Sequence, residues 1–206
     1  IDAEVMGKRE KEKRNLYIEG VQNNGIIIHY EYIINSEGTI EIRHVLKPEG
    51  KMPLWFPRIG LTLTVSDALD QVKWYGRGPQ ENYPDRKTGY PTGIYASTVQ
   101  AMYEPYLMPQ DYGLRTDVRW LQLTTDKGIG LQFKMNEWFN FNIYPYSTDN
   151  LTKAMYTYQL QKQKGMTLNL DYATTGVGCT ARGVFGAYKA MPQEYRRTIS
   201  IRPMMK

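Results

Sequence analysis

Several residue types are scarce in this 206-residue chain, and each scarcity excludes a class of protein. With one cysteine, Cys179, the chain can form neither an intrachain disulfide framework nor a cysteine-based zinc site. No apolar run approaches the roughly 18 residues that a membrane helix needs. No glycine-rich motif is followed by the Lys-Ser/Thr pair of a phosphate-binding loop. These absences predict no membrane span and no nucleotide site, and they leave the compartment open between cytoplasm and periplasm.

Charge is low and evenly spread. The formal net charge is +5, and lysines and arginines are scattered apart from a run at residues 8–14 that mixes both signs. Such a run indicates a solvated segment and no nucleic-acid partner. We interpret residues 1–25 as a mixed-charge lead-in segment, with an edge strand as one alternative for it. Because the chain starts at Ile1 rather than Met, we expect a fragment of a longer protein, folded over residues 26–206.

Tyrosine is abundant, with 17 residues, and apolar and polar residues alternate over many short segments. Tyrosine suits the half-buried pleated surface of a sheet. Short strands between Gly- and Pro-bearing turns predict an all-β antiparallel sandwich. Residues 150–155 look weakly helical, and the loop-rich residues 76–117 are expected to be functional or held against a partner. The expected strands are 26–34, 39–46, 58–65, 72–75, 120–124, 129–135, 139–144, 166–172 and 198–202.

The two histidines fall in the first predicted hairpin. A four-residue connection over residues 35–38 sets Ile34 opposite Thr39. Counting back from that pair places His29 opposite His44. Zinc needs further ligands and the chain has no third histidine, so no metal site is predicted. The four tryptophans are expected in the core or at an interface rather than as sugar platforms; they are Trp55, Trp74, Trp120 and Trp138.

Four charged residues gather in the central loop, among Gly, Pro and Asn. They are Arg77, Glu81, Asp85 and Arg86. One interpretation is structural: arginine–carboxylate pairs hold an irregular loop against the sheet. The other is catalytic, because glycoside hydrolysis uses two carboxyl groups about 5–9 Å apart. Sequence spacing within a loop does not determine that distance, so both interpretations stay open at this point.

The order of residues in this loop identifies a protein family more specifically than its charged groups identify a function. It closely resembles a signature of the C-terminal domain (small-chain region, domain 5) of LacZ-type β-galactosidases, retaining enzymes of glycoside hydrolase family 2. Neighbouring segments are similar in the same order, namely residues 57–61, 102–115, 168–171 and 176–178. The resemblance runs from about residue 26 to the end of the chain. The signature residues are Gly78, Pro79, Gln80, Glu81, Asn82, Tyr83, Pro84, Asp85 and Arg86.

The resemblance implies a large antiparallel supersandwich, similar to galactose mutarotase. It also implies that the two catalytic glutamates lie in a separate TIM-barrel domain, which this chain does not contain. We therefore expect no catalytic residue here, no hydrolysis by this fragment alone, and a structural role for the signature loop. The implied partners are the barrel of the parent chain, a galactoside substrate and further copies in a homo-oligomer. No cofactor is expected in the fragment, while the parent enzyme is expected to use Mg or Na ions.

The loop after the Gly176–Gly178 turn is where the resemblance implies contact with sugar. In the family this loop reaches back to the barrel, often with an aromatic residue that stacks on the substrate. Here the corresponding place falls near Arg182, and no aromatic residue precedes Phe185. A guanidinium can stack on a sugar or donate hydrogen bonds to its hydroxyls. A solvated loop arginine is the alternative, and the predicted substrate-binding residues are Arg182, Cys179 and Thr180.

The main functional hypothesis is a non-catalytic domain that completes the active-site rim of a β-galactosidase for terminal non-reducing β-D-galactose. The alternative is an independent carbohydrate-binding β-sandwich module, which the surplus of tyrosine supports. A mutarotase-like epimerase follows only from analogy of fold. That reaction needs a general acid and base over the sugar, and neither His29 nor His44 falls in a loop that resembles such a site.

Overall fold

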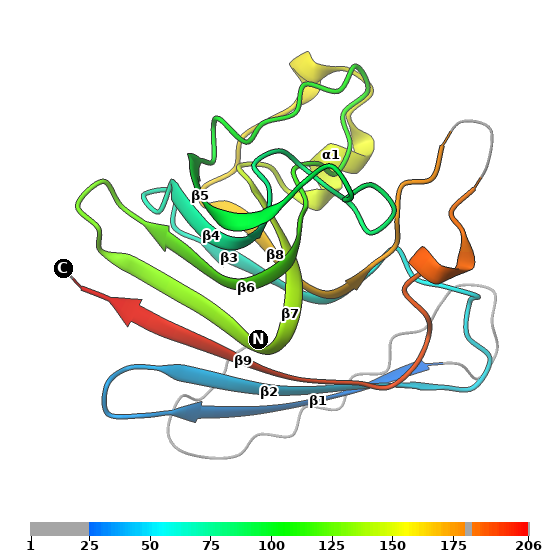
Figure 1. Ribbon diagram of the computed structural model, residues 1–206, viewed down its shortest axis with the longest axis horizontal. Helices are drawn as coiled ribbons and strands as arrows, with labels where there is room; N and C mark the ends of the chain where they lie inside the picture. Colours follow the sequence, from blue (N-terminus) through cyan, green and yellow to red (C-terminus); the bar gives the residue numbers. More distant parts are fainter. Residues whose placement is uncertain (1–24, 180–182, 206) are drawn as a thin grey trace.

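The computed structural model describes residues 25–179 and 183–205, and this part is an antiparallel all-β structure with little helix (Figure 1). The predicted fold class is confirmed, including the weak helix. The lead-in segment assigned to residues 1–25 lies, apart from Gly25, outside the described residues. The elements are β1 (Gly25–Ile34), β2 (Ile40–Glu49), β3 (Arg58–Val65), β4 (Gln71–Arg77), β5 (Thr92–Thr98), β6 (Arg115–Thr124), β7 (Gly130–Tyr144), α1 (Thr148–Lys153), β8 (Met166–Thr174) and β9 (Tyr195–Met204), with 3₁₀ turns at Thr157–Gln159 and Gly186–Tyr188.

The sheet is organised by β7, which joins its two parts. The order is β1-β2-β9-β7-β6-β4-β5, and β8 adds to β7 and carries β3. The first half of β7, up to Met135, pairs with β9, and the second half, from Asn140, pairs with β8. Figure 1 shows β1, β2 and β9 as a lower layer, with the remaining strands above them. The sequence predicted two strands here, and the structure corrects this to one strand that changes partner between residues 135 and 140.

The main hydrophobic core lies between these strands, and a smaller cluster forms around Tyr112, Tyr144 and Leu151. The largest fully buried side chains of the main core come from β4, β6, β7 and β8, with Ile199 from β9. Trp74 contacts Phe141 edge-on at 5.9 Å and Tyr95 at 5.5 Å between ring centroids. Trp74 also donates its indole N–H to the carbonyl of Arg77 at 3.0 Å. The core therefore holds the strand end at which the signature loop begins.

The β1–β2 hairpin corrects the predicted register by one residue. Ile34 pairs with Ile40, and Tyr30, not His29, pairs with His44. The backbone N–H of Asn35 bonds to the carbonyl of Thr39, so the connecting loop has three residues instead of four. Gly38 adopts a φ of 76°, which the left-handed position of such a loop requires. The sequence alone did not distinguish the two loop lengths, and a shift of one residue moves every side chain to the other face.

One strand was missed. β5 forms the edge beyond β4, inside the stretch that the sequence assigned to loop. Its sequence, Thr-Gly-Ile-Tyr-Ala-Ser-Thr, contains Gly, Ala and Ser, which are not strand-forming residues. An edge strand with one hydrogen-bonded neighbour needs little burial, so its hydrophobic pattern is weak.

Candidate functional site: the signature loop and the glycine turn

The signature loop starts at the end of β4 and is closed by Arg77. Arg77 Nε lies 2.6 Å from Asp117 Oδ2. Its Nη1 donates to the carbonyl oxygens of Lys87 and Tyr90 at 3.1 and 2.9 Å. The Lys87 ammonium also bonds to Asp117 at 2.9 Å. One arginine therefore joins the start of the loop to its end and to β6.

Glu81 lies inside the loop and is 6% exposed. It accepts hydrogen bonds from Arg86 Nη2 at 2.5 Å, the Gly113 N–H at 2.9 Å and the Tyr106 hydroxyl, with Tyr83 at 3.3 Å. Burial opposes ionisation, but the bonds from Tyr106, Gly113 and Arg86 outweigh it and lower the pKa of Glu81. The carboxylate is thus held ionised with both oxygens engaged.

Asn82 attaches the same loop to β6. Its Oδ1 accepts from the backbone N–H of Thr116 at 3.1 Å and from the Thr116 hydroxyl at 2.5 Å. Its own N–H donates to the carbonyl of Leu114 at 2.8 Å. The Asn82 side chain is fully buried, and these bonds satisfy polar atoms that burial would otherwise leave unpaired.

Asp85 reaches a different segment, 92 residues further along the chain. Its Oδ1 accepts from the Val177 N–H at 3.0 Å and its Oδ2 from the Gly178 N–H at 2.7 Å. A Cβ on Gly176 would lie 2.3 Å from Asp85 Cγ, so the approach requires glycine there. Gly178 has a φ of 66°, a left-handed conformation that glycine adopts without strain. The signature loop therefore holds the Gly176–Gly178 turn directly.

Of the three predicted substrate-binding residues, the structure describes one. Cys179 is exposed and has a free thiol. Thr180 and Arg182 lie outside the described residues. The turn that immediately precedes all three is the one held by Asp85. The sequence resemblance identified both segments, but nothing in their spacing indicated that they touch.

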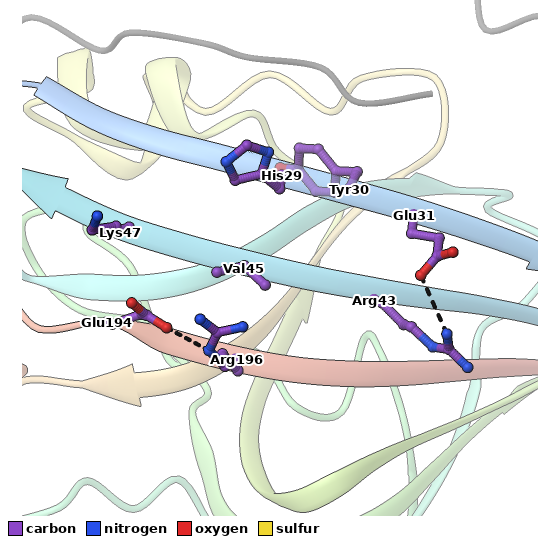
Figure 2. Close-up of a pocket in the computed structure, with 8 residues that line it drawn as sticks. All are labelled: His29, Tyr30, Glu31, Arg43, Val45, Lys47, Glu194 and Arg196. Carbon is purple, nitrogen blue, oxygen red and sulfur yellow. Dashed lines mark hydrogen bonds and ion pairs between the residues drawn. The ribbon is translucent and has the colours of Figure 1, made fainter. Parts of the chain in front are cut away.

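The two histidines lie on opposite faces of the β1–β2 layer. Figure 2 shows His29 at a hollow on the outer face, where two ion pairs form between lining residues: Arg43 contacts Glu31 at 3.2 Å, and Arg196 contacts Glu194. His44 points inward, is buried, and contacts the Tyr172 hydroxyl through Nδ1. Burial lowers the pKa of His44 to about 4. The predicted cross-strand histidine pair is therefore wrong.

The four tryptophans differ in their burial. Trp74 is buried in the core as predicted, and Trp120 is half-buried in β6. Trp55 and Trp138 are 39% and 60% exposed, so neither belongs to the core of this chain. Among the described residues, no group of three or more His, Cys, Asp or Glu could hold a metal ion. No helix in the same residues is long and apolar enough to cross a membrane.

Fold and loop together define an all-β antiparallel sandwich domain in which a charged loop supports a glycine turn. Residues 3–201 match the family described as the β-galactosidase small chain, and this chain belongs to that family. A β-galactosidase of Priestia megaterium is 38% identical over 147 residues, which are 71% of this chain and 14% of that protein. Those of Vibrio cholerae and Lactococcus lactis are 39% and 35% identical over 150 and 152 residues, each covering 72% of this chain. The chain spans 14% of the length of these relatives.

Proposed function

We propose that this chain is the non-catalytic C-terminal sandwich of a β-galactosidase that hydrolyses terminal non-reducing β-D-galactose residues. Its task is to complete the active-site rim, with the catalytic glutamates on a TIM-barrel domain on which it packs. The observation that carries this proposal is the pair of hydrogen bonds from the Val177 and Gly178 amides to Asp85. They fix the backbone from which the predicted substrate segment, Cys179 to Arg182, continues.

A fixed turn matters because a rim residue acts by position. Misplacing a substrate contact by about 1 Å can cost roughly a hundredfold in rate. Charge-assisted bonds to backbone amides are about twice as strong as neutral ones, and Asp85 makes two of them. The signature loop then acts as the support of the rim, and Glu81 and Asn82 act as the support of the loop.

The contacts of the two signature carboxylates argue against a catalytic pair in this chain. A retaining glycosidase needs one carboxylate free to attack the anomeric carbon and one carboxylic acid able to release a proton. Glu81 is buried under four donors, and its lowered pKa disfavours the protonated form. Asp85 has each oxygen on a backbone amide. Both carboxylates therefore serve as scaffold in this proposal.

The partners follow from the same scheme. The barrel of the parent packs against this chain, any Mg or Na ion is held outside this chain, and copies assemble into a homo-oligomer. β5 ends the described sheet, and an edge strand offers backbone groups to another chain.

Enzyme assays test whether this chain is non-catalytic by itself and required by its parent. The isolated 206-residue chain should release no product from a chromogenic β-galactoside, and deletion of this region from its parent should abolish or alter activity. Robust hydrolysis by the isolated chain would contradict the proposal. A parent that keeps full kcat/KM without this region would contradict the role at the rim.

A further inference from the structure

Trp138 is held rigidly at the surface, where a large apolar side chain would not be expected. It is 60% exposed, whereas its neighbour Phe139 is buried. The guanidinium of Arg119 lies 4.0 Å over the Trp138 ring and 5.1 Å over the ring of Tyr75. Arg119 in turn donates to the carbonyl of Asp117. The stacked guanidinium favours one orientation of the indole, and a ring oriented in advance loses less entropy when a ligand binds to it.

Trp138 borders a hollow of about 220 Å³, about the room that one sugar ring needs. Other walls come from segments that already converge on the glycine turn. They include Pro84 of the signature loop, Lys87 directly after it, and Tyr188, whose own carbonyl accepts the Gly176 N–H at 2.8 Å. Tyr188 is 40% exposed, so the hollow has a second aromatic wall. Polar and charged side chains, among them Lys87, Asp117 and Asn140, make up much of the remaining wall, so the hollow offers many hydrogen-bonding groups beside its two aromatic rings.

Two residues that line the hollow, Asn140 and Lys87, have N–H donors beyond those used in their own hydrogen bonds. Asn140 accepts one bond from the Asp117 N–H at 3.3 Å and donates one to Thr174 at 3.2 Å. Its amide has two N–H donors, and within the described part of the chain only one of them is engaged. The Lys87 ammonium has three donors, of which two suffice for its bonds to Asp117. These donors suit the oxygen atoms of hydroxyl groups.

The charges beside the hollow are mixed. Asp117 lies between Arg77 and Lys87, at 2.6 and 2.9 Å, and offsets part of their cationic charge, while Lys189 adds a further cation to the lining. A phosphate would meet this carboxylate, which favours neutral hydroxyl groups over an anion. Trp and Tyr offer an apolar face with a polar edge, which matches a pyranose with its C–H face and hydroxyl rim.

We propose that this hollow is a binding subsite for one neutral sugar ring, with Trp138 as the stacking platform and Asn140 and Lys87 as hydroxyl donors. The subsite lies at the base of the glycine turn and belongs to this chain alone. It therefore goes beyond the proposed function, because sugar binds here without the barrel.

Indole N–H resonances of the isolated chain provide the test. The chain has four tryptophans and hence four such signals, assigned by substitution of each in turn. Titration with galactose and lactose to high millimolar concentration should shift the Trp138 signal saturably. Trp138→Ala should weaken binding, followed on the Tyr188 ring resonances, about tenfold or more, as removal of an aromatic anchor does. Tyr188→Ala should also weaken it, followed on the Trp138 signal.

Trp55→Ala is the matched control. Trp55 is another exposed tryptophan beside a cation, with the Lys189 ammonium 5.7 Å from its ring, and it does not line the hollow. Its loss should leave sugar affinity unchanged, while retained dispersion of the remaining indole signals reports folding. A Trp138 signal that fails to move with either sugar, or binding that survives both Trp138→Ala and Tyr188→Ala, overturns the subsite. The hydrolysis assay is separate, so failure here leaves the proposed function standing.

Discussion

Two buried carboxylates, one in the signature loop and one in β8, behave in opposite ways. Glu81 is 6% exposed and Asp171 is 1% exposed. The pKa of Glu81 is lowered, whereas burial raises the pKa of Asp171 to about 7. Asp171 has Arg58 at 3.1 Å and the Thr174 hydroxyl at 3.3 Å, and Arg58 is shared with Asp111. Glu81 has donors on both oxygens, including a backbone amide and an arginine.

The difference shows that burial and the supply of donors together decide whether a carboxylate stabilises this domain, since Asp171 is the more completely desolvated of the two and has fewer donors. In the signature loop, ionised Glu81 holds the loop together. In β8, the charge of Asp171 is a cost that protonation relieves. The segment that supports the glycine turn is therefore stabilised by charge, and the strand that leads into the turn is weakened by it. Four substitutions sharpen or break this comparison, from the largest expected effect on stability to the smallest.

Glu81→Gln should have the largest effect, a loss of about 2–3 kcal/mol of unfolding free energy at pH 7, because it leaves the half-exposed Arg86 and a buried N–H without their charged partner. The folded pKa of Glu81 lies below its unfolded value, so its contribution is present above the unfolded pKa and is lost as pH falls through the folded pKa. Urea denaturation across pH measures both effects. Asp149→Asn, in an exposed pair with Lys153, is the control and should cost about 0–0.5 kcal/mol. A loss below about 1 kcal/mol for Glu81→Gln would contradict the central role of Glu81.

Asp171→Asn should act in the opposite sense. The folded pKa lies near 7 and the unfolded value near about 4, so wild-type stability falls as pH rises between the two. The variant should lack this fall and be more stable than the wild type at pH 8, by an amount on the order of a few kcal/mol. Thermal unfolding at pH 5 and pH 8 measures the difference. Equal pH slopes for variant and wild type would remove Asp171 from the comparison.

Asp85→Ala should cost about 1–3 kcal/mol, concentrated at the glycine turn. Hydrogen exchange of the Val177 and Gly178 amides should accelerate about tenfold or more, since 1.4 kcal/mol corresponds to a factor of ten. Amides of the β6–β7 core should keep their protection. Asp126→Ala, in the exposed turn after β6, serves as the control and should leave the two turn amides unchanged. Unaltered hydrogen exchange at Val177 and Gly178 in Asp85→Ala would contradict the proposal that Asp85 holds the glycine turn.

Trp138→Ala should have the smallest effect, below about 1 kcal/mol, because the ring is mostly solvent-exposed and its main contact is the cation–π pair with Arg119. Trp74→Ala, by contrast, empties part of the core and should cost about 3–5 kcal/mol. Chemical denaturation of the two variants side by side makes the comparison. Similar losses for both would mean that Trp138 is a packing residue and not a free platform.

Alternating hydrophobicity and turn residues were sufficient to predict the fold class, the positions of eight of the nine strands in the described residues, with β7 divided into two, and the helix near residue 150. The residue sequence of the signature loop was sufficient to predict the family. These features are local: side chains of a strand alternate between two faces, and a signature is a run of consecutive residues. Thr92–Thr98 escaped because an edge strand needs little hydrophobic patterning.

Only the tertiary structure decided which distant residues meet. The one-residue shift of the β1–β2 hairpin separated His29 from His44, and the contact of Asp85 with Gly178 joined segments 93 residues apart. Trp138 likewise lies in the interval where β7 changes partner between β9 and β8. Sequence alone thus determined the elements and the kinship of this chain. The contacts that support the turn and shape the hollow came from the way the strands stack, because hydrogen bonds and burial depend on distances in space that spacing along the chain does not set.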